Sequence, residues 1–94
     1  MPPSAQDLPL GDSASTETPI RSSVELGAVI RDQRKRLALK QLDLAGLGNT
    51  GNRFIVDLEN GKPTVQLQKV LDLMDLLGLE VVVRTKASRS TSSL

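Results

Sequence analysis

The sequence contains neither cysteine nor histidine. Without cysteine there are no disulfides and no thiolate metal sites. Without histidine, the commonest general base and the commonest metal ligand are both missing. The carboxylates form no paired or ligand-spaced cluster, and neither a nucleophile–base pair nor a phosphate-binding loop is visible. We therefore predict that the protein is not an enzyme and uses no cofactor and no metal.

Long apolar runs are also missing from the sequence. No stretch approaches the length of a membrane span, and the N-terminus lacks the basic-then-apolar pattern of a signal peptide. These features predict a soluble, cytoplasmic protein.

Both ends of the chain lack helical or strand periodicity. Residues 1–22 are rich in Pro, Ser, Thr and Gly, and residues 86–94 have a similar composition. Such segments cannot bury enough surface to offset their ordering entropy, so we predict that both are disordered tails. About 60 residues remain for a folded unit, which is marginal alone, and dimerisation is a common remedy.

Three helical segments are predicted in the first part of this unit. Residues 24–37 carry apolar residues at helical spacing after Ser23, a plausible N-cap. A second helix begins at residue 39 and ends near 47, and a third spans about 51–59. Asn49 lies between them and tolerates the left-handed conformation of a tight turn.

A fourth helix is expected after Gly61, which has the freedom to end the third one in a left-handed conformation. Thr64 is predicted to cap this helix, whose apolar residues recur at helical spacing up to Leu77, and Gly78 stops it. The β-branched run that follows predicts a strand at 80–85. A lone strand needs a partner for its N–H and C=O groups, so we expect it to pair with its two-fold copy in a homodimer. The predicted dimerisation residues are Leu73, Leu76, Val81, Val82 and Val83.

Charge is unevenly distributed along this unit. Residues 31–40 are mostly basic, whereas residues 70–80 carry acidic side chains and no base. This distribution indicates either a polarised domain or two solvated helix faces.

Two helices joined by a tight turn and followed by an amphipathic helix form a helix-turn-helix arrangement. In register, residues 24–79 resemble the Cro/lambda-repressor-like (Xre) family, and the matching positions are Leu39, Gln41, Leu44, Ala45, Ile55, Leu58, Glu59, Gly61 and Lys62. Lys40, Asn49 and Gly51 depart from the family pattern. The resemblance implies an all-α domain of four to five helices at 23–79, here with the short C-terminal β-strand.

The third helix is expected to bury its apolar stripe and to present Asn52, Arg53 and Val56 outward at its N-terminal end. In a helix-turn-helix protein that end enters the major groove. Arginine can bind guanine bidentately, asparagine can bind adenine, and valine can contact a thymine methyl. Asp57 has two readings, as an acceptor from cytosine or as a partner of Arg53.

A second set of residues is expected to contact DNA phosphates. Gln41 begins the second helix, whose N-terminus favours anions, and the resemblance assigns it a phosphate contact. Lys40, Asn60 and Lys62 flank the same surface, and Gly51 lets the backbone approach DNA closely. Leu44, Ala45, Ile55 and Leu58 are predicted core residues. Arg34 and Glu59 resemble the family's partly buried structural ion pair.

The run from Gly51 to Val83 is similar to one branch of the family in particular, the HipB-type antitoxins. That likeness implies a repressor of its own operon that binds double-stranded palindromic DNA as a homodimer and neutralises a HipA-like serine/threonine kinase toxin. The alternatives are a stand-alone Xre-family regulator without a toxin, and an interaction module that no longer reads DNA.

Overall fold

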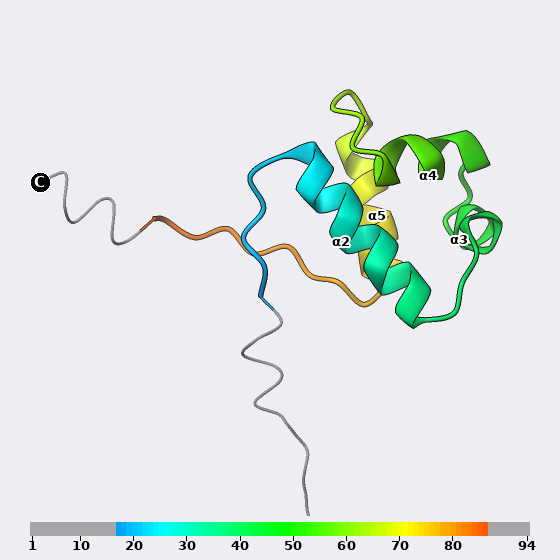
Figure 1. The fold of residues 1–94 in the computed structure, drawn as a ribbon, viewed down its shortest axis with the longest axis horizontal. Helices are drawn as coiled ribbons and strands as arrows, with labels where there is room; N and C mark the ends of the chain where they lie inside the picture. The colour runs from blue at the N-terminus through cyan, green and yellow to red at the C-terminus, as the bar shows by residue number, and fades with distance from the viewer. Residues whose placement is uncertain (1–16, 87–94) are drawn as a thin grey trace, which may run out of the picture.

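The computed structural model describes residues 17–86, which contain four helices (Figure 1). In chain order these are α2 (Ser23–Arg36), α3 (Gln41–Leu47), α4 (Asn52–Glu59) and α5 (Leu67–Leu76). The predicted all-α fold is confirmed for this part of the chain. The tail segments 1–16 and 87–94 lie outside the described residues. None of the helices found between residues 17 and 86 has the length and apolarity needed to cross a membrane.

Helix α2 begins one residue earlier than the sequence indicated. The side chain of Ser22, not Ser23, caps it, because the Ser22 hydroxyl accepts a hydrogen bond of 3.1 Å from the Glu25 N–H. Ser23 lies inside the helix, where its hydroxyl donates to the Gly61 carbonyl at 2.8 Å. The predicted cap was wrong because two adjacent serines offer the same chemistry, and the second one is used for a tertiary contact.

The turn between α3 and α4 has the predicted left-handed residue. Asn49 has a φ of 55°, and the following Thr50 N–H bonds back to the Ala45 carbonyl at 2.9 Å. A methyl group at Gly48 would come within 2.4 Å of the Leu73 side chain, so α5 packs directly against this turn. The turn therefore fixes α3 relative to α4 and also places both against α5.

The connection from α4 to α5 differs from the prediction at one end. Gly61 ends α4 with a φ of 87°, as expected. Thr64, however, does not cap α5: it lies in an exposed turn, and Gln66 is the residue that precedes the helix. The intervening Val65 packs partly against the core, which keeps the chain extended until Gln66.

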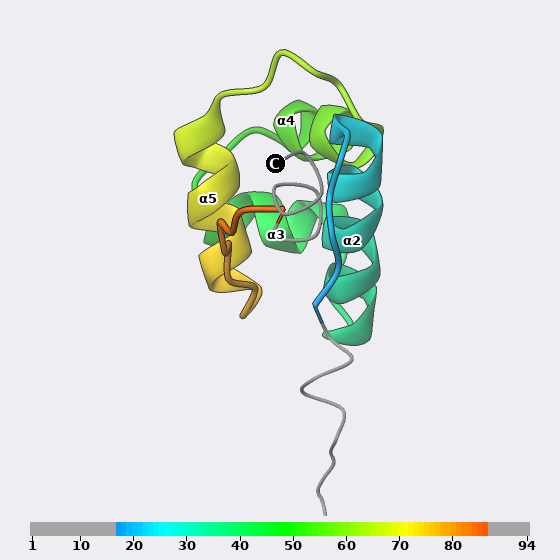
Figure 2. The ribbon, with the colours of Figure 1, turned by 90° about the vertical axis from the view of Figure 1, so that its left-hand side faces the viewer.

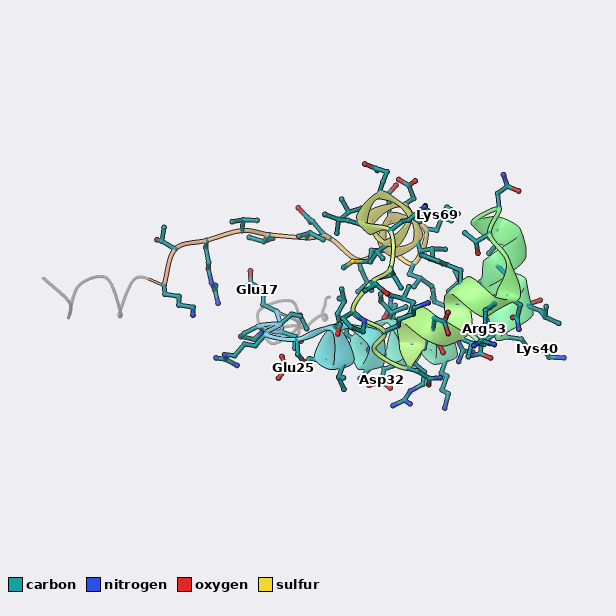
Figure 3. The ribbon with its side chains drawn as sticks, turned by 90° about the horizontal axis from the view of Figure 1, so that it is seen from above. Glu17, Glu25, Asp32, Lys40, Arg53 and Lys69 are labelled. Atoms are coloured by element: carbon teal, nitrogen blue, oxygen red, sulfur yellow. The ribbon has the colours of Figure 1, made fainter. Side chains whose placement is uncertain are left out.

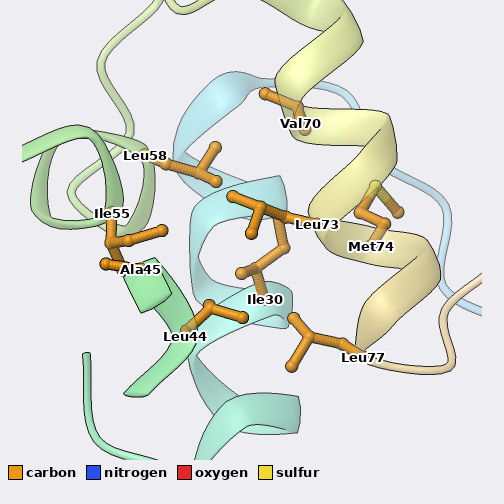
Figure 4. Close-up of a cluster of buried hydrophobic side chains, with 9 residues drawn as sticks. All are labelled: Ile30, Leu44, Ala45, Ile55, Leu58, Val70, Leu73, Met74 and Leu77. Carbon is orange, nitrogen blue, oxygen red and sulfur yellow. The ribbon is translucent and has the colours of Figure 1, made fainter. Parts of the chain in front are cut away.

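The core lies where the four helices meet (Figures 2 and 4). Helices α2 and α5 stand on opposite sides in Figure 2, with α3 and α4 between them. Side chains from all four helices converge in one cluster, and the four predicted core residues are all in it. The members are Ile30, Leu44, Ala45, Ile55, Leu58, Val70, Leu73, Met74 and Leu77.

Leu73 is the clearest correction among the predicted dimerisation residues. Its side chain is fully buried within a single chain, at 0 % exposure, so it cannot cover a partner's surface. Leu76, in contrast, is 50 % exposed on the outer side of α5. Helical periodicity placed both on one face, but α5 packs against the α3–α4 turn on the side that carries Leu73.

The segment after α5 runs extended and belongs to no strand ladder within residues 17–86. Leu79 packs partly on the core, and its N–H bonds the Met74 carbonyl at 2.8 Å. Val81, Val82 and Val83 are 52 %, 60 % and 92 % exposed. A strand needs a neighbour to pair with, and within residues 17–86 this segment makes no backbone hydrogen bond after Leu79; it contacts the N-terminal part through the Arg84–Glu17 side-chain pair at 2.9 Å.

Candidate nucleic-acid interface

The N-terminal end of α4 projects two polar side chains away from the core. Asn52 and Arg53 are exposed, and the Arg53 side chain reaches 87 % exposure. Val56, one turn further on, is half-buried. Figure 3 shows Arg53 and Lys40 at the same end of the molecule, opposite Glu17 and Glu25. The predicted base-reading residues therefore share one end of one helix.

The opposite side of α4 holds this end in place. Ile55 is 0 % and Leu58 3 % exposed, and both belong to the core cluster. Phe54 is half-buried, and the Lys69 ammonium of α5 lies 5.5 Å from the centre of its ring. Sequence reasoning missed Lys69, because nothing in its spacing from Phe54 indicates contact between the two helices. Anchoring on two sides makes α4 a rigid support for its exposed end.

The predicted phosphate-contacting residues lie around both ends of α4, since Gly51 is its N-cap, Asn60 its C-cap, and Lys62 follows. Lys40, Asn60 and Lys62 are exposed, and the space in front of Gly51 is open, since a methyl group there would meet nothing within 4 Å. Lys40 is the N-cap of α3, and its N–H donates to the Asp43 carboxylate at 2.8 Å. Sequence reasoning missed this role of Asp43, although an acidic side chain three residues after the cap is a known signal for a helix start.

Gln41 is placed differently from the other predicted phosphate contacts. Its side chain is half-buried, and Nε2 donates to the Glu59 carboxylate at 3.1 Å. An amide nitrogen carries a second N–H, so Gln41 can still offer one donor to an anion. The Gln41 side chain is thus held by its hydrogen bond to Glu59 at the end of α4.

Arg34 and Glu59 form a buried, bidentate ion pair between α2 and the end of α4. Arg34 Nε donates to Glu59 Oε2 at 2.6 Å, and Nη2 donates to Oε1 at 3.0 Å. The two side chains are 9 % and 2 % exposed. Arg34 Nη1 also donates to the Leu39 carbonyl at 2.7 Å. The pair ties α2, α4 and the start of α3 together, with every charged atom in a short hydrogen bond.

Asp57 lies beside the exposed end and contacts two of the predicted DNA-binding residues. Its Oδ1 accepts from Arg53 Nε at 3.1 Å, and its Oδ2 lies 3.5 Å from the Lys62 ammonium. Of the two readings that the sequence left open, the structure therefore contains the pairing with Arg53. The second partner, Lys62, was not foreseen.

The chain shares sequence with a known regulator and its fold with several solved structures. No protein-family model matches the chain. The chain is 43 % identical over 70 residues to the uncharacterised HTH-type transcriptional regulator y4mF of Sinorhizobium fredii. The aligned region covers 74 % of this chain and 92 % of that relative. An identity of this size over nearly the whole relative shows shared family membership.

Solved structures give the same fold. A HipB–O4 20mer complex matches with a TM-score of 0.68 and 18 % identity, covering 74 % of this chain and 99 % of that one. A HipA–HipB–O2–O3 complex contains a chain that matches with the same score, identity and coverage. At 18 % identity these structures show a shared fold and nothing more. The chain belongs to the Xre-like family of helix-turn-helix transcriptional regulators and is similar to HipB.

Proposed function

We propose that the protein is a sequence-specific repressor that reads the major groove with the N-terminal end of α4. The observation that carries this proposal is the contrast between the two sides of α4. One side is anchored by Ile55 and Leu58 in the core, and the other presents Asn52 and an 87 % exposed Arg53. Exposed, rigidly supported polar side chains are what base recognition in a groove requires.

Each of the reading residues has a matching base. Arg53 suits guanine O6 and N7, Asn52 suits adenine N6 and N7, and Val56 suits a thymine methyl. A good bidentate contact contributes about 1–3 kcal/mol of discrimination against the wrong base. Lys40, Lys62 and the remaining predicted residues, Gln41, Gly51 and Asn60, supply phosphate contacts, which set the register of the helix on the duplex without reading sequence.

The repressor acts as a homodimer in this proposal. Exposed Val81, Val82 and Val83 form an extended segment whose backbone makes no hydrogen bond within residues 17–86, and Leu76 adds apolar surface on α5. Pairing of two such segments across a two-fold axis would cover both. Two copies of α4 would then read palindromic half-sites about one helical turn apart, roughly 34 Å.

The biological role that we propose is that of an antitoxin. Likeness to HipB, which is found in a HipA–HipB–O2–O3 complex, supports a chain that represses its own operon and neutralises a HipA-like serine/threonine kinase toxin. A stand-alone regulator of the same family without a toxin is the second candidate, supported by the relative described only as a transcriptional regulator.

The groove-reading role is tested with Arg53→Ala. A library of duplexes with a randomised centre is selected on the wild-type protein, and affinities for the selected duplex and a scrambled duplex are compared. We expect the discrimination to fall by about 5- to 150-fold, the equivalent of one lost base contact. Arg21→Ala is the matched control, because it removes the same charge from an exposed residue near Glu25, at the other end of the molecule (Figure 3). Unchanged discrimination in Arg53→Ala would contradict the proposal.

The antitoxin role needs a separate experiment, a pull-down of the tagged protein at native expression followed by mass spectrometry. A stoichiometric kinase-like partner is expected. Recovery of the protein without such a partner would favour the stand-alone regulator.

A further inference from the structure

The carboxylate of Asp57 lies between two exposed cations of the candidate interface. Its side chain is 22 % exposed, whereas those of Arg53 and Lys62 are 87 % and 52 % exposed. The anion is therefore recessed, and the two cations reach over it toward solvent. A carboxylate in the middle of a surface meant for phosphates is unfavourable by charge alone, so its presence calls for a local role.

The backbone explains how one carboxylate meets both cations. Arg53 and Asp57 are four residues apart on α4, so their side chains share a face of the helix. Lys62 arrives from the other direction, because Gly61 turns the chain back with a φ of 87° and the Lys62 N–H bonds the Asp57 carbonyl at 2.9 Å. The side-chain pairing of Lys62 thus repeats a contact already made by its backbone.

The atoms used on Arg53 are the important detail. Asp57 takes the Nε–H, and within residues 17–86 the two Nη groups of Arg53 make no hydrogen bond. These groups carry the remaining N–H donors of the guanidinium, so they can still bind two acceptors on one base edge. A guanidinium fixed at Nε also has fewer orientations to lose when it binds.

We infer that Asp57 is a positioning residue, which holds the Arg53 guanidinium in the orientation that reads a base and links it to the phosphate-contacting Lys62. This inference rests on the proposed function and deepens it. Asp57 does not touch DNA itself. It acts through Arg53, and its effect disappears when Arg53 is removed.

The experiment is a double-mutant cycle on sequence discrimination, with Asp57→Asn, Arg53→Ala and the double variant. Discrimination is the ratio of dissociation constants for a scrambled duplex and for the duplex selected by the wild-type protein. We expect Asp57→Asn to lower this ratio at least about fivefold, to relax the same base position as Arg53→Ala, and to lower it no further in the double variant. Asp75→Asn, which removes one exposed carboxylate from α5, is the matched control and leaves the ratio unchanged.

Four results would overturn the inference. An unchanged ratio in Asp57→Asn shows that the carboxylate does not position Arg53. A relaxed base position that differs from that of Arg53→Ala, or a further loss in the double variant, shows that Asp57 reads a base directly. If the wild-type protein selects no sequence at all, both the proposed function and the role of Asp57 are wrong. Circular dichroism melting of Asp57→Asn, a substitution of equal size at a partly exposed site, checks that the fold is kept.

Discussion

Truncating Glu59 should cost most of the stability of the domain. In Glu59→Ala the Arg34 Nε and Nη2 atoms lose their acceptors at 2.6 and 3.0 Å, and Gln41 Nε2 loses its own at 3.1 Å. The Arg34 side chain is only 9 % exposed, so water cannot replace the lost carboxylate without a rearrangement. Leaving a buried charge without its partner costs about 3–5 kcal/mol. Small domains have stabilities near the lower end of the usual range of about 5–15 kcal/mol.

Urea unfolding followed by far-ultraviolet circular dichroism measures this loss, because the chain has no Trp or Tyr for fluorescence. With a slope of about 1.5 kcal/mol per molar, the midpoint should fall by at least about 2 M. All variants are compared at one protein concentration, since dimerisation would make the midpoint concentration-dependent. Arg84→Ala is the control, because its ion pair with Glu17 is exposed on both sides and should contribute less than about 1 kcal/mol.

A second variant isolates the cause of the loss. Arg34→Met combined with Glu59→Leu removes both charges and keeps most of the volume, so it should be much closer to the wild type than Glu59→Ala is. The reasoning would be refuted if Glu59→Ala stayed within about 1 kcal/mol of the wild type. It would be refuted equally if the double variant were as unstable as the single one.

Two substitutions that change the backbone constraints, at Ala38 and Gly27, should alter stability in opposite directions. Ala38 has a φ of 59°, which is strained for alanine, so Ala38→Gly should stabilise the domain by about 0.5–1 kcal/mol and raise Tm by a few degrees; a lower Tm would contradict this. Gly27→Ala should destabilise it by about 1–3 kcal/mol, because the new methyl group would lie 2.4 Å from the Leu58 carbonyl oxygen. Gly46→Ala is the matched control within α3: its methyl group would meet nothing within 4 Å, so it should stabilise by about 0.5–1 kcal/mol. Equal effects of the two alanines in thermal melts would show that α2 and α4 do not approach as closely as described.

The parts of the fold that the sequence predicted well depend on residues with distinctive local chemistry. Asn49 and Gly61 are left-handed, as expected, because asparagine and glycine are the residue types that adopt this conformation readily. Ala38 is left-handed too, but alanine gives no such signal. Its conformation is imposed by the fold, since the Arg34 carbonyl accepts from the N–H groups on both sides of it, those of Leu37 and Leu39.

Tertiary packing decided the features that the sequence could not predict. Helical spacing puts Leu73 and Leu76 on α5 but does not say which of them faces the α3–α4 turn, and the structure buries Leu73 there. Thr64 has the chemistry of a cap, yet packing of Val65 delays the helix. Within the candidate interface, the Arg53–Asp57 pair follows from a spacing of four residues, whereas the approach of Lys62 to Asp57 depends on the turn at Gly61.

The most direct test of the central claim, that α4 reads a palindromic operator, is a hydroxyl-radical footprint of the wild-type protein on the DNA upstream of its own gene. The account predicts two protected half-sites of inverted sequence, about one helical turn or roughly 34 Å apart, and loss of this protection in Arg53→Ala at the same protein concentration. Uniform protection along the fragment, or a footprint that Arg53→Ala leaves unchanged, would contradict it.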